Sequence, residues 1–135
     1  MKNILVLAFF ISFIVFLMSL SIYFFYITPV YEFSYSATAY VTENVGGFDL
    51  NSTALTFGSI AVGGSSTRTI LVDNYYSFPV RVEPHVEGTI SKIISYQPLI
   101  VGPNETSRFS FTVSADSFDL LGNYTGNVII RLKRV

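Results

Sequence analysis

The first part of the chain is continuously apolar. No charged side chain occurs from Ile4 to Tyr31, with Lys2 before this run and Glu32 after it. Roughly 20 apolar residues suffice for a helix to cross the hydrocarbon core of a bilayer. A secretory signal peptide has a shorter apolar centre of roughly 7 to 15 residues, and the one A-x-A-like triplet, at 37–39, lies beyond the run. Residues 1–31 are therefore predicted to be an uncleaved transmembrane anchor.

The flanks of this run predict its orientation. Lys2 and the amino terminus carry the positive charge that favours the cytoplasmic side. Tyr23, Tyr26 and Tyr31 lie at the other end, where amphipathic rings favour the headgroup layer, and Pro29 would end the helix. We therefore expect a single-pass protein with a cytoplasmic N-terminus and residues 32–135 as one extracytoplasmic domain.

After the anchor, the hydrophobic period changes to two. Phe33, Tyr35, Ala37, Ala39 and Val41 alternate with polar residues and Tyr40, which is typical of a strand with one buried face. Similar runs surround Leu55 and Phe57, Ile70 and Val72, Val80 and Val82, Ile90 to Tyr96, Phe109 to Val113, and Val128 to Leu132. Turn sequences separate them: Gly46-Gly47, Gly63-Gly64, Asp73-Asn74, Gly102-Pro103-Asn104 and Gly122-Asn123. The pattern predicts an all-β, antiparallel β-sandwich of about seven or eight strands.

Composition removes several classes of function. The 135 residues leave room for one domain besides the anchor, and the formal net charge of -1 provides no basic surface for nucleic acid. The chain has no cysteine, which excludes disulfides, thiolate metal sites and thiol nucleophiles. The expected partners are proteins and the lipid bilayer.

Four segments carry a family resemblance. Their order is Leu55-Thr56-Phe57-Gly58, then 68–74, then Pro79-Val80-Arg81-Val82, then 122–130. This order resembles immunoglobulin-like domains of the group that includes major-sperm-protein-like and related prokaryotic surface domains. The resemblance implies an Ig-like sandwich that scaffolds or binds proteins. Tyr124 is similar to the tyrosine corner of such domains, although an ordinary buried tyrosine fits equally, and Gly126 stands where antibody-type domains have a cysteine.

Candidate chemistry is sparse. His85, the single histidine, is expected to point outward beside Glu83 and Glu87, without the further ligands that a metal site needs. Asp116 and Asp119 lie three residues apart, a spacing that is more typical of turn caps than of acid–base catalysis. We therefore expect no enzyme, no metal and no cofactor; an enzyme would need Glu83, His85, Glu87 and Asp116 gathered in one pocket.

Three N-x-S/T sequons follow the anchor, at Asn51, Asn104 and Asn123. They are candidate glycosylation sites in an outward-facing domain. Asn104 follows Gly102-Pro103, so its plainer role is in a turn.

Two places are candidate interfaces. Tyr75, Tyr76 and Phe78 fall in one loop, where they either recognise a protein or pack across the end of the sandwich. The first strand, with Phe33 and Tyr35, either pairs within its own domain or completes the sheet of a neighbouring copy. The sequence thus predicts a surface module that binds another envelope protein. Archaellum stator proteins, which also join an N-terminal helix to a small sandwich, are a narrower version of this class, and no motif in the sequence selects them. The alternative is a filament or pilus subunit that donates its N-terminal strand after leader cleavage.

Overall fold

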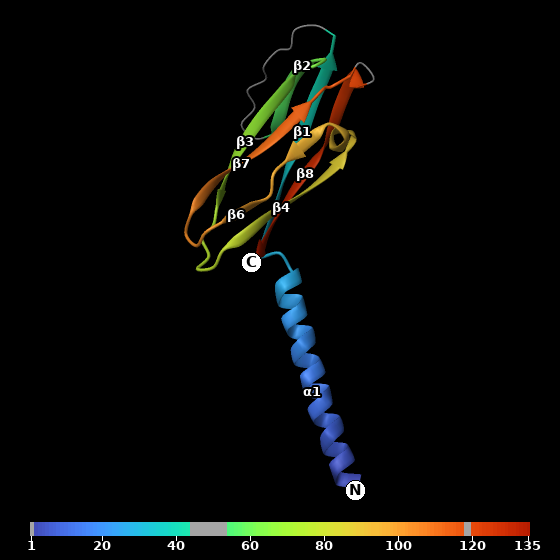
Figure 1. Cartoon of the computed structure of the whole chain (residues 1–135), viewed down its shortest axis with the longest axis vertical. Helices are drawn as coiled ribbons and strands as arrows, with labels where there is room; N and C mark the ends of the chain where they lie inside the picture. The colour runs from blue at the N-terminus through green and yellow to red at the C-terminus, as the bar shows by residue number, and fades with distance from the viewer. Residues whose placement is uncertain (1, 44–53, 118–119) are drawn as a thin grey trace.

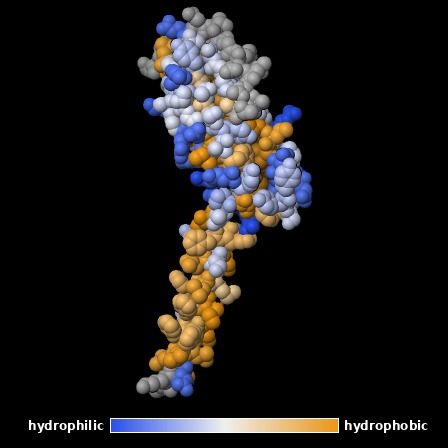
Figure 2. Space-filling view, turned by 180° about the vertical axis from the view of Figure 1, so that it is seen from behind, coloured by the Kyte–Doolittle hydropathy of each residue, from blue (hydrophilic) through white to orange (hydrophobic). Residues whose placement is uncertain are grey.

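The computed structural model describes residues 2–43, 54–117 and 120–135, and it places one helix below a two-layered β domain (Figure 1). The helix α1 spans Lys2–Ile27 and is long and apolar enough to cross a membrane, by length and composition. Its apolar side chains are exposed on every side, and Figure 2 shows them in orange along most of its length, below a mostly white and blue domain. An all-round apolar surface is typical of a helix surrounded by lipid.

The rest of the described chain is mostly β, as predicted, with eight strands in two curled, sandwich-like layers. The strands are β1 (Tyr31–Thr42), β2 (Leu55–Ala61), β3 (Ser65–Asp73), β4 (Val80–Gly88), β5 (Ile94–Tyr96), β6 (Leu99–Val101), β7 (Thr106–Ser114) and β8 (Gly122–Arg134). One sheet has the order β2-β1-β8-β4-β6 and the other β3-β7-β5. A short 3-10 helix, η1, covers Thr89–Lys92.

The first strand lies inside its own sheet. β1 pairs antiparallel with β8 over eleven positions, from Tyr31 opposite Leu132 to Val41 opposite Gly122. On its other side it pairs with β2, in parallel and only from Ala37 onward. β1 is also longer than the expected 33–41, because β8 continues beside it almost to the helix.

The core lies between the two sheets and follows the alternation seen in the sequence. Ala37, Ala39 and Val41 are buried from β1, and Phe111 and Ile130 are fully buried from β7 and β8. The opposite face of the smaller sheet is polar, with hydroxyl pairs Thr67–Thr112 at 2.9 Å and Thr69–Ser110 at 2.8 Å between β3 and β7. The period-two pattern therefore correctly predicted which side chains face the core.

Gly63-Gly64 forms a turn, as predicted, but this turn joins β2 to β3 in the other sheet instead of two paired strands. Two other local predictions were wrong. The expected strand from Ile90 to Tyr96 begins as η1, which buries Ile90 and leaves only β5 as strand. Gly122-Asn123 is the start of β8 rather than a turn. In each case a contact with a distant strand decides the local conformation.

Candidate protein-binding groove

A groove opens on one side of the sandwich, beside the first residues of β1. Within the described chain, residues 31–36 have a strand partner on the β8 side only, since pairing with β2 begins at Ala37. Further from the helix, β3 closes this side: Arg68 Nε donates to Thr56 O at 2.6 Å and Ser66 Oγ donates to Phe57 O at 2.9 Å. Nearer the helix, β3 faces the unpaired part of β1, and the two sheets stand open.

Aromatic side chains line this opening, which encloses about 540 Å³. Tyr31, Phe33 and Tyr35 form one wall, with ring centroids of neighbouring pairs 5.7 Å apart. The other wall comes from β3 and the loop that follows it, with Leu71, Tyr75 and Tyr76. Leu71 and Tyr75 are 63% and 83% exposed, which is unusual for such large side chains and leaves them free to contact a partner.

A buried amide shapes the loop that carries Tyr75. Asn74 is 1% exposed, and its side-chain nitrogen contacts the carbonyl oxygens of Phe78 at 2.9 Å, Val101 at 3.2 Å and Gly102 at 2.8 Å. Its side-chain oxygen accepts a hydrogen bond from Tyr76 N at 3.0 Å. Because buried polar groups need such partners, Asn74 ties residues 74–78 to the turn that starts at Gly102.

The three loop aromatics have different surroundings. Tyr76 donates from its hydroxyl to Val30 O at 3.1 Å and stacks on Phe78, with centroids 5.0 Å apart and planes at 16°. These two rings pack across the end of the sandwich next to the helix. Tyr75 projects outward, and its hydroxyl lies 3.3 Å from a carboxylate oxygen of Asp73. The loop therefore packs two of its rings across the end of the sandwich and exposes the third.

The structure brings together the two candidate interfaces, which are forty residues apart in sequence. Phe33, Tyr35, Tyr75 and Tyr76 line the same groove, and Phe78 supports it beneath Tyr76. Leu71, an apolar residue on the polar face of its strand, was not predicted as part of an interface, and Asn74 was predicted only as part of a turn. The signal that could have marked Leu71 is its apolar side chain at a position where the alternation expects a polar one.

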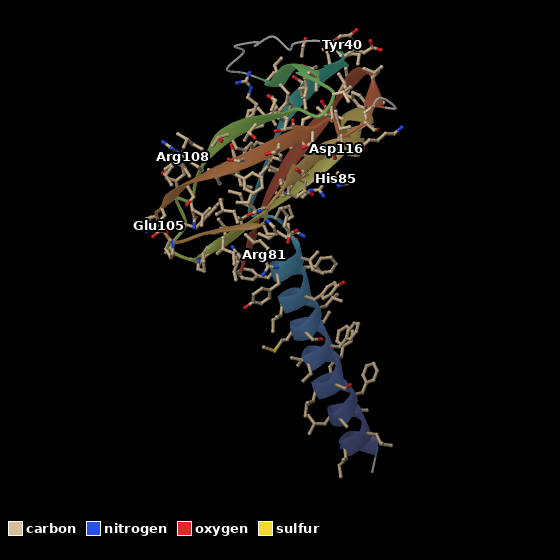
Figure 3. All side chains as sticks on the ribbon, turned by 45° about the horizontal axis from the view of Figure 1, so that its top comes forward. Tyr40, Arg81, His85, Glu105, Arg108 and Asp116 are labelled. Carbon is tan, nitrogen blue, oxygen red and sulfur yellow. The ribbon has the colours of Figure 1, made fainter. Side chains whose placement is uncertain are left out.

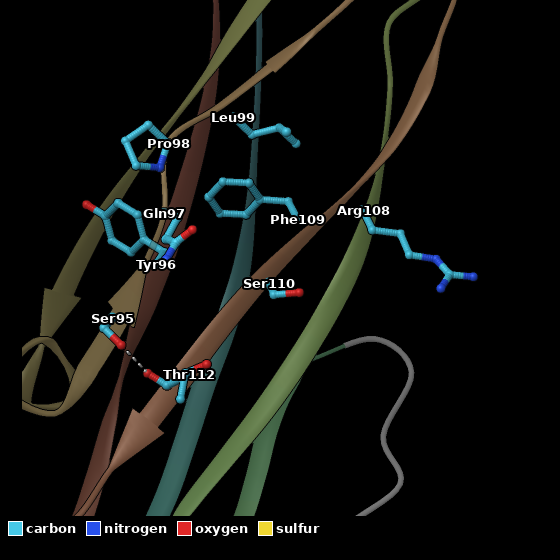
Figure 4. A pocket seen from close by; sticks show the side chains of 9 residues that line it. All are labelled: Ser95, Tyr96, Gln97, Pro98, Leu99, Arg108, Phe109, Ser110 and Thr112. Carbon is cyan, nitrogen blue, oxygen red and sulfur yellow. Dashed lines mark hydrogen bonds between the residues drawn. The ribbon is translucent and has the colours of Figure 1, made fainter.

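A second groove lies at the opposite side, where the chain crosses from β5 to β6 at Gln97 and Pro98 (Figure 4). It encloses about 650 Å³, but Ser95, Ser110 and Thr112 make its walls more polar. Its exposed ring, Tyr96, already donates to Pro84 O at 3.1 Å and contacts Phe109 and Phe111. Arg108, a charged side chain, also lines this groove (Figure 4). This groove offers less unsatisfied apolar surface than the first.

The candidate catalytic residues are not gathered in a pocket of the described chain. His85 Nε2 lies 3.5 Å from Glu87, with both side chains more than half exposed, and Glu83 pairs instead with Lys133 at 2.6 Å. Among residues 2–43, 54–117 and 120–135, no three acidic or histidine side chains form a group able to hold a metal. Asp119 lies outside the described residues.

The remaining candidates are surface or core positions. Asn104, with φ 54°, and Asn123 are both exposed, whereas Asn51 lies outside the described residues. Tyr124 is in the core at 9% exposure, and no described residue accepts a hydrogen bond from its hydroxyl, unlike in a tyrosine corner. It is therefore best described as an ordinary buried tyrosine.

The fold and groove define a class: a β-sandwich behind an apolar helix, with an open aromatic side. In comparisons with known proteins, no family model matches the chain, and neither does any curated protein or solved structure.

Proposed function

We propose that this protein is a membrane-anchored, non-catalytic surface module that binds an extended segment of another envelope protein in the groove beside β1. The observation that carries the proposal is an aromatic groove next to residues 31–36, which have no strand partner on that side within the described chain. An open strand edge offers backbone donors and acceptors, and a groove beside it accepts alternate side chains of an added strand.

The dimensions suit a short strand. Six extended residues span about 20 Å at roughly 3.3 Å per residue, and a bound strand of that length places about three side chains toward the groove. Exposed tyrosine adds contact area with little loss of side-chain freedom. Leu71 and Tyr75 would then lose their exposure, which gives binding an apolar contribution.

The helix supports the membrane part of the proposal. Lys2 at its start favours a cytoplasmic N-terminus, so the sandwich faces outward. β1 begins at Tyr31, only a few residues after α1 ends at Ile27, which places the groove close to the bilayer. The partner segment is therefore expected within a short distance of the membrane surface.

An Ig-like topology is part of the same proposal. Two mostly antiparallel sheets enclose one core, and the connections from β2 through β8 pass from one sheet to the other. Strand crossing between two packed sheets is typical of Ig-like sandwiches. This fits a scaffold that presents a binding edge rather than a catalytic cleft.

The alternative filament subunit would require β1 to leave its own sheet. That exchange breaks eleven pairings with β8 and removes Ala37, Ala39 and Val41 from the core. These contacts favour a partner strand that binds at the edge of β1 over a β1 that leaves its own sheet. Intact mass and N-terminal sequence of protein from native membranes test this: a start at Met1 supports the anchored module, and a start between Thr28 and Tyr40 supports the filament.

Photo-crosslinking tests the groove. A photoreactive phenylalanine replaces Tyr75 in the full chain, and in a matched control it replaces Tyr40, another exposed tyrosine at the far end of β1 (Figure 3). We expect a specific adduct from position 75 alone. Leu71→Glu should abolish that adduct. Ile100→Glu, at another exposed apolar residue (53%) on β6, should leave it unchanged.

The outcomes separate the candidates. An adduct with a different protein, lost in Leu71→Glu only, supports the proposal. Equal labelling from both tyrosines, or an adduct indifferent to Leu71→Glu, would refute the groove as the binding site. An adduct between two copies of this chain would replace the envelope partner with self-association.

A further inference from the structure

Arg134 breaks the pattern of its strand. Val128, Ile130 and Leu132 point into the core, and the same alternation gives Arg134 an inward position at the end of the sandwich nearest the helix. A charged residue at an inward position needs a counter-charge or an unusual environment. Its surroundings therefore call for an explanation.

Two aromatic rings hold the guanidinium. Its central carbon lies 3.5 Å from the ring centroid of Phe25 on α1 and 4.8 Å from that of Phe78 on the loop. Cation–π contacts at these distances orient the planar group but supply no hydrogen-bond acceptors. Arg134 Nε is buried and has no acceptor, and the described residues provide Arg134 with no ion pair.

The depth of Phe25 identifies the missing partner. From Ile4 to Phe25 the helix rises about 32 Å at about 1.5 Å per residue, and the hydrocarbon core is about 30 Å thick. If α1 spans the membrane, Phe25 thus lies at the outer boundary of the hydrocarbon, and Arg134 lies at the level of the lipid phosphates.

We propose that Arg134, clamped between Phe25 and Phe78, binds the phosphate of a phospholipid headgroup in the outer leaflet. The proposal rests on the membrane anchor of the proposed function. Guanidinium pairs with phosphate through two parallel N–H···O bonds, a geometry that its planar fork favours. Because Nε is buried, the two terminal Nη groups make this contact, and it holds the open end of the sandwich against the bilayer.

Neighbouring charges make this end attractive to an anion. Arg81, which is opposite Lys133 in the β4–β8 ladder, is exposed beside the end of the helix in Figure 3 and has no ion-pair partner in the described chain. Lys133 is neutralised by Glu83, at 2.6 Å. Within the described chain, the unpaired cations near the helix are therefore Arg134, which contacts Phe25 and Phe78, and Arg81.

Solid-state NMR on the full chain in bilayers tests the contact directly. The arginines are labelled with ¹⁵N in the guanidinium, and the protein is reconstituted in phosphatidylcholine vesicles, with or without phosphatidylglycerol. We expect ³¹P of the lipid to dephase a guanidinium signal in the wild type. That dephasing should disappear in Arg134→Gln and in Arg134→Lys, which both lack the labelled group, and persist in Arg108→Gln.

Each outcome has one meaning. Wild-type dephasing that is lost only with Arg134 supports the lipid site. A wild type without dephasing that still resists carbonate extraction overturns the lipid site and leaves the anchor intact. Extraction by carbonate overturns the anchor and the lipid site with it. Equal dephasing by inorganic phosphate in phosphorus-free detergent overturns the lipid as the source and makes the site one for soluble phosphate.

Discussion

The loop that forms one wall of the groove depends on a single buried amide, so Asn74→Ala is the most informative substitution. It removes three contacts to carbonyl oxygens and one bond accepted from Tyr76 N. Losing a part-buried hydrogen bond costs about 0.5–1.5 kcal/mol, and orphaning a buried group costs about 1–3 kcal/mol. The Val101 carbonyl is the fully buried partner, whereas water can reach the others in part.

The expected loss of unfolding free energy is therefore about 3 kcal/mol, equivalent to a fall in Tm of roughly 10–20 °C for a domain of this size. Urea unfolding of the full chain in detergent, followed by tyrosine fluorescence, measures it. Asn127→Ala, an exposed residue on β8, is the matched control and should change stability by less than about 0.5 kcal/mol. The chain has no tryptophan and no cysteine, so the fluorescence comes from tyrosine without interference from either residue.

The same variant should also weaken the Tyr75 crosslink, since Asn74 fixes the position of the next two residues. If Asn74→Ala unfolds like the wild type, the amide does not organise the loop, and the wall of the groove must be held by the stacking of Tyr76 on Phe78 instead.

Two further predictions concern the sheet. Gly126→Ala should prevent folding or lower Tm sharply, because an added Cβ would overlap the Glu87 carbonyl of β4; circular dichroism of the variant that matches the wild type in β signal and Tm would contradict this packing. Glu32→Gln breaks a 2.7 Å ion pair with Arg131 whose side chains are 48% and 39% exposed, so the cost should stay below about 1 kcal/mol in the same urea assay. A larger loss would mean that the first residues of β1 depend on this pair.

Part of the candidate site was accessible from the sequence. The alternation from Phe33 to Val41 identified a strand, and three aromatics between two strands marked their loop as a candidate interface. What the sequence did not provide was their proximity, because that depends on β3 crossing to the second sheet and facing β1. Leu71 and Asn74 were missed for the same reason: their roles lie in contacts with residues distant in the chain.

The sequence by itself determined the elements whose cause is local. A run of apolar residues longer than a bilayer core is a helix suited to lipid, and a period of two fixes which side chains are buried. The tertiary structure decided the rest. Within the described chain, β2 pairs with β1 only from Ala37 onward, and the end of β8 places Arg134 close to Phe25 and Phe78. Register and sheet order arise from contacts between distant segments, whose free energy no local pattern records.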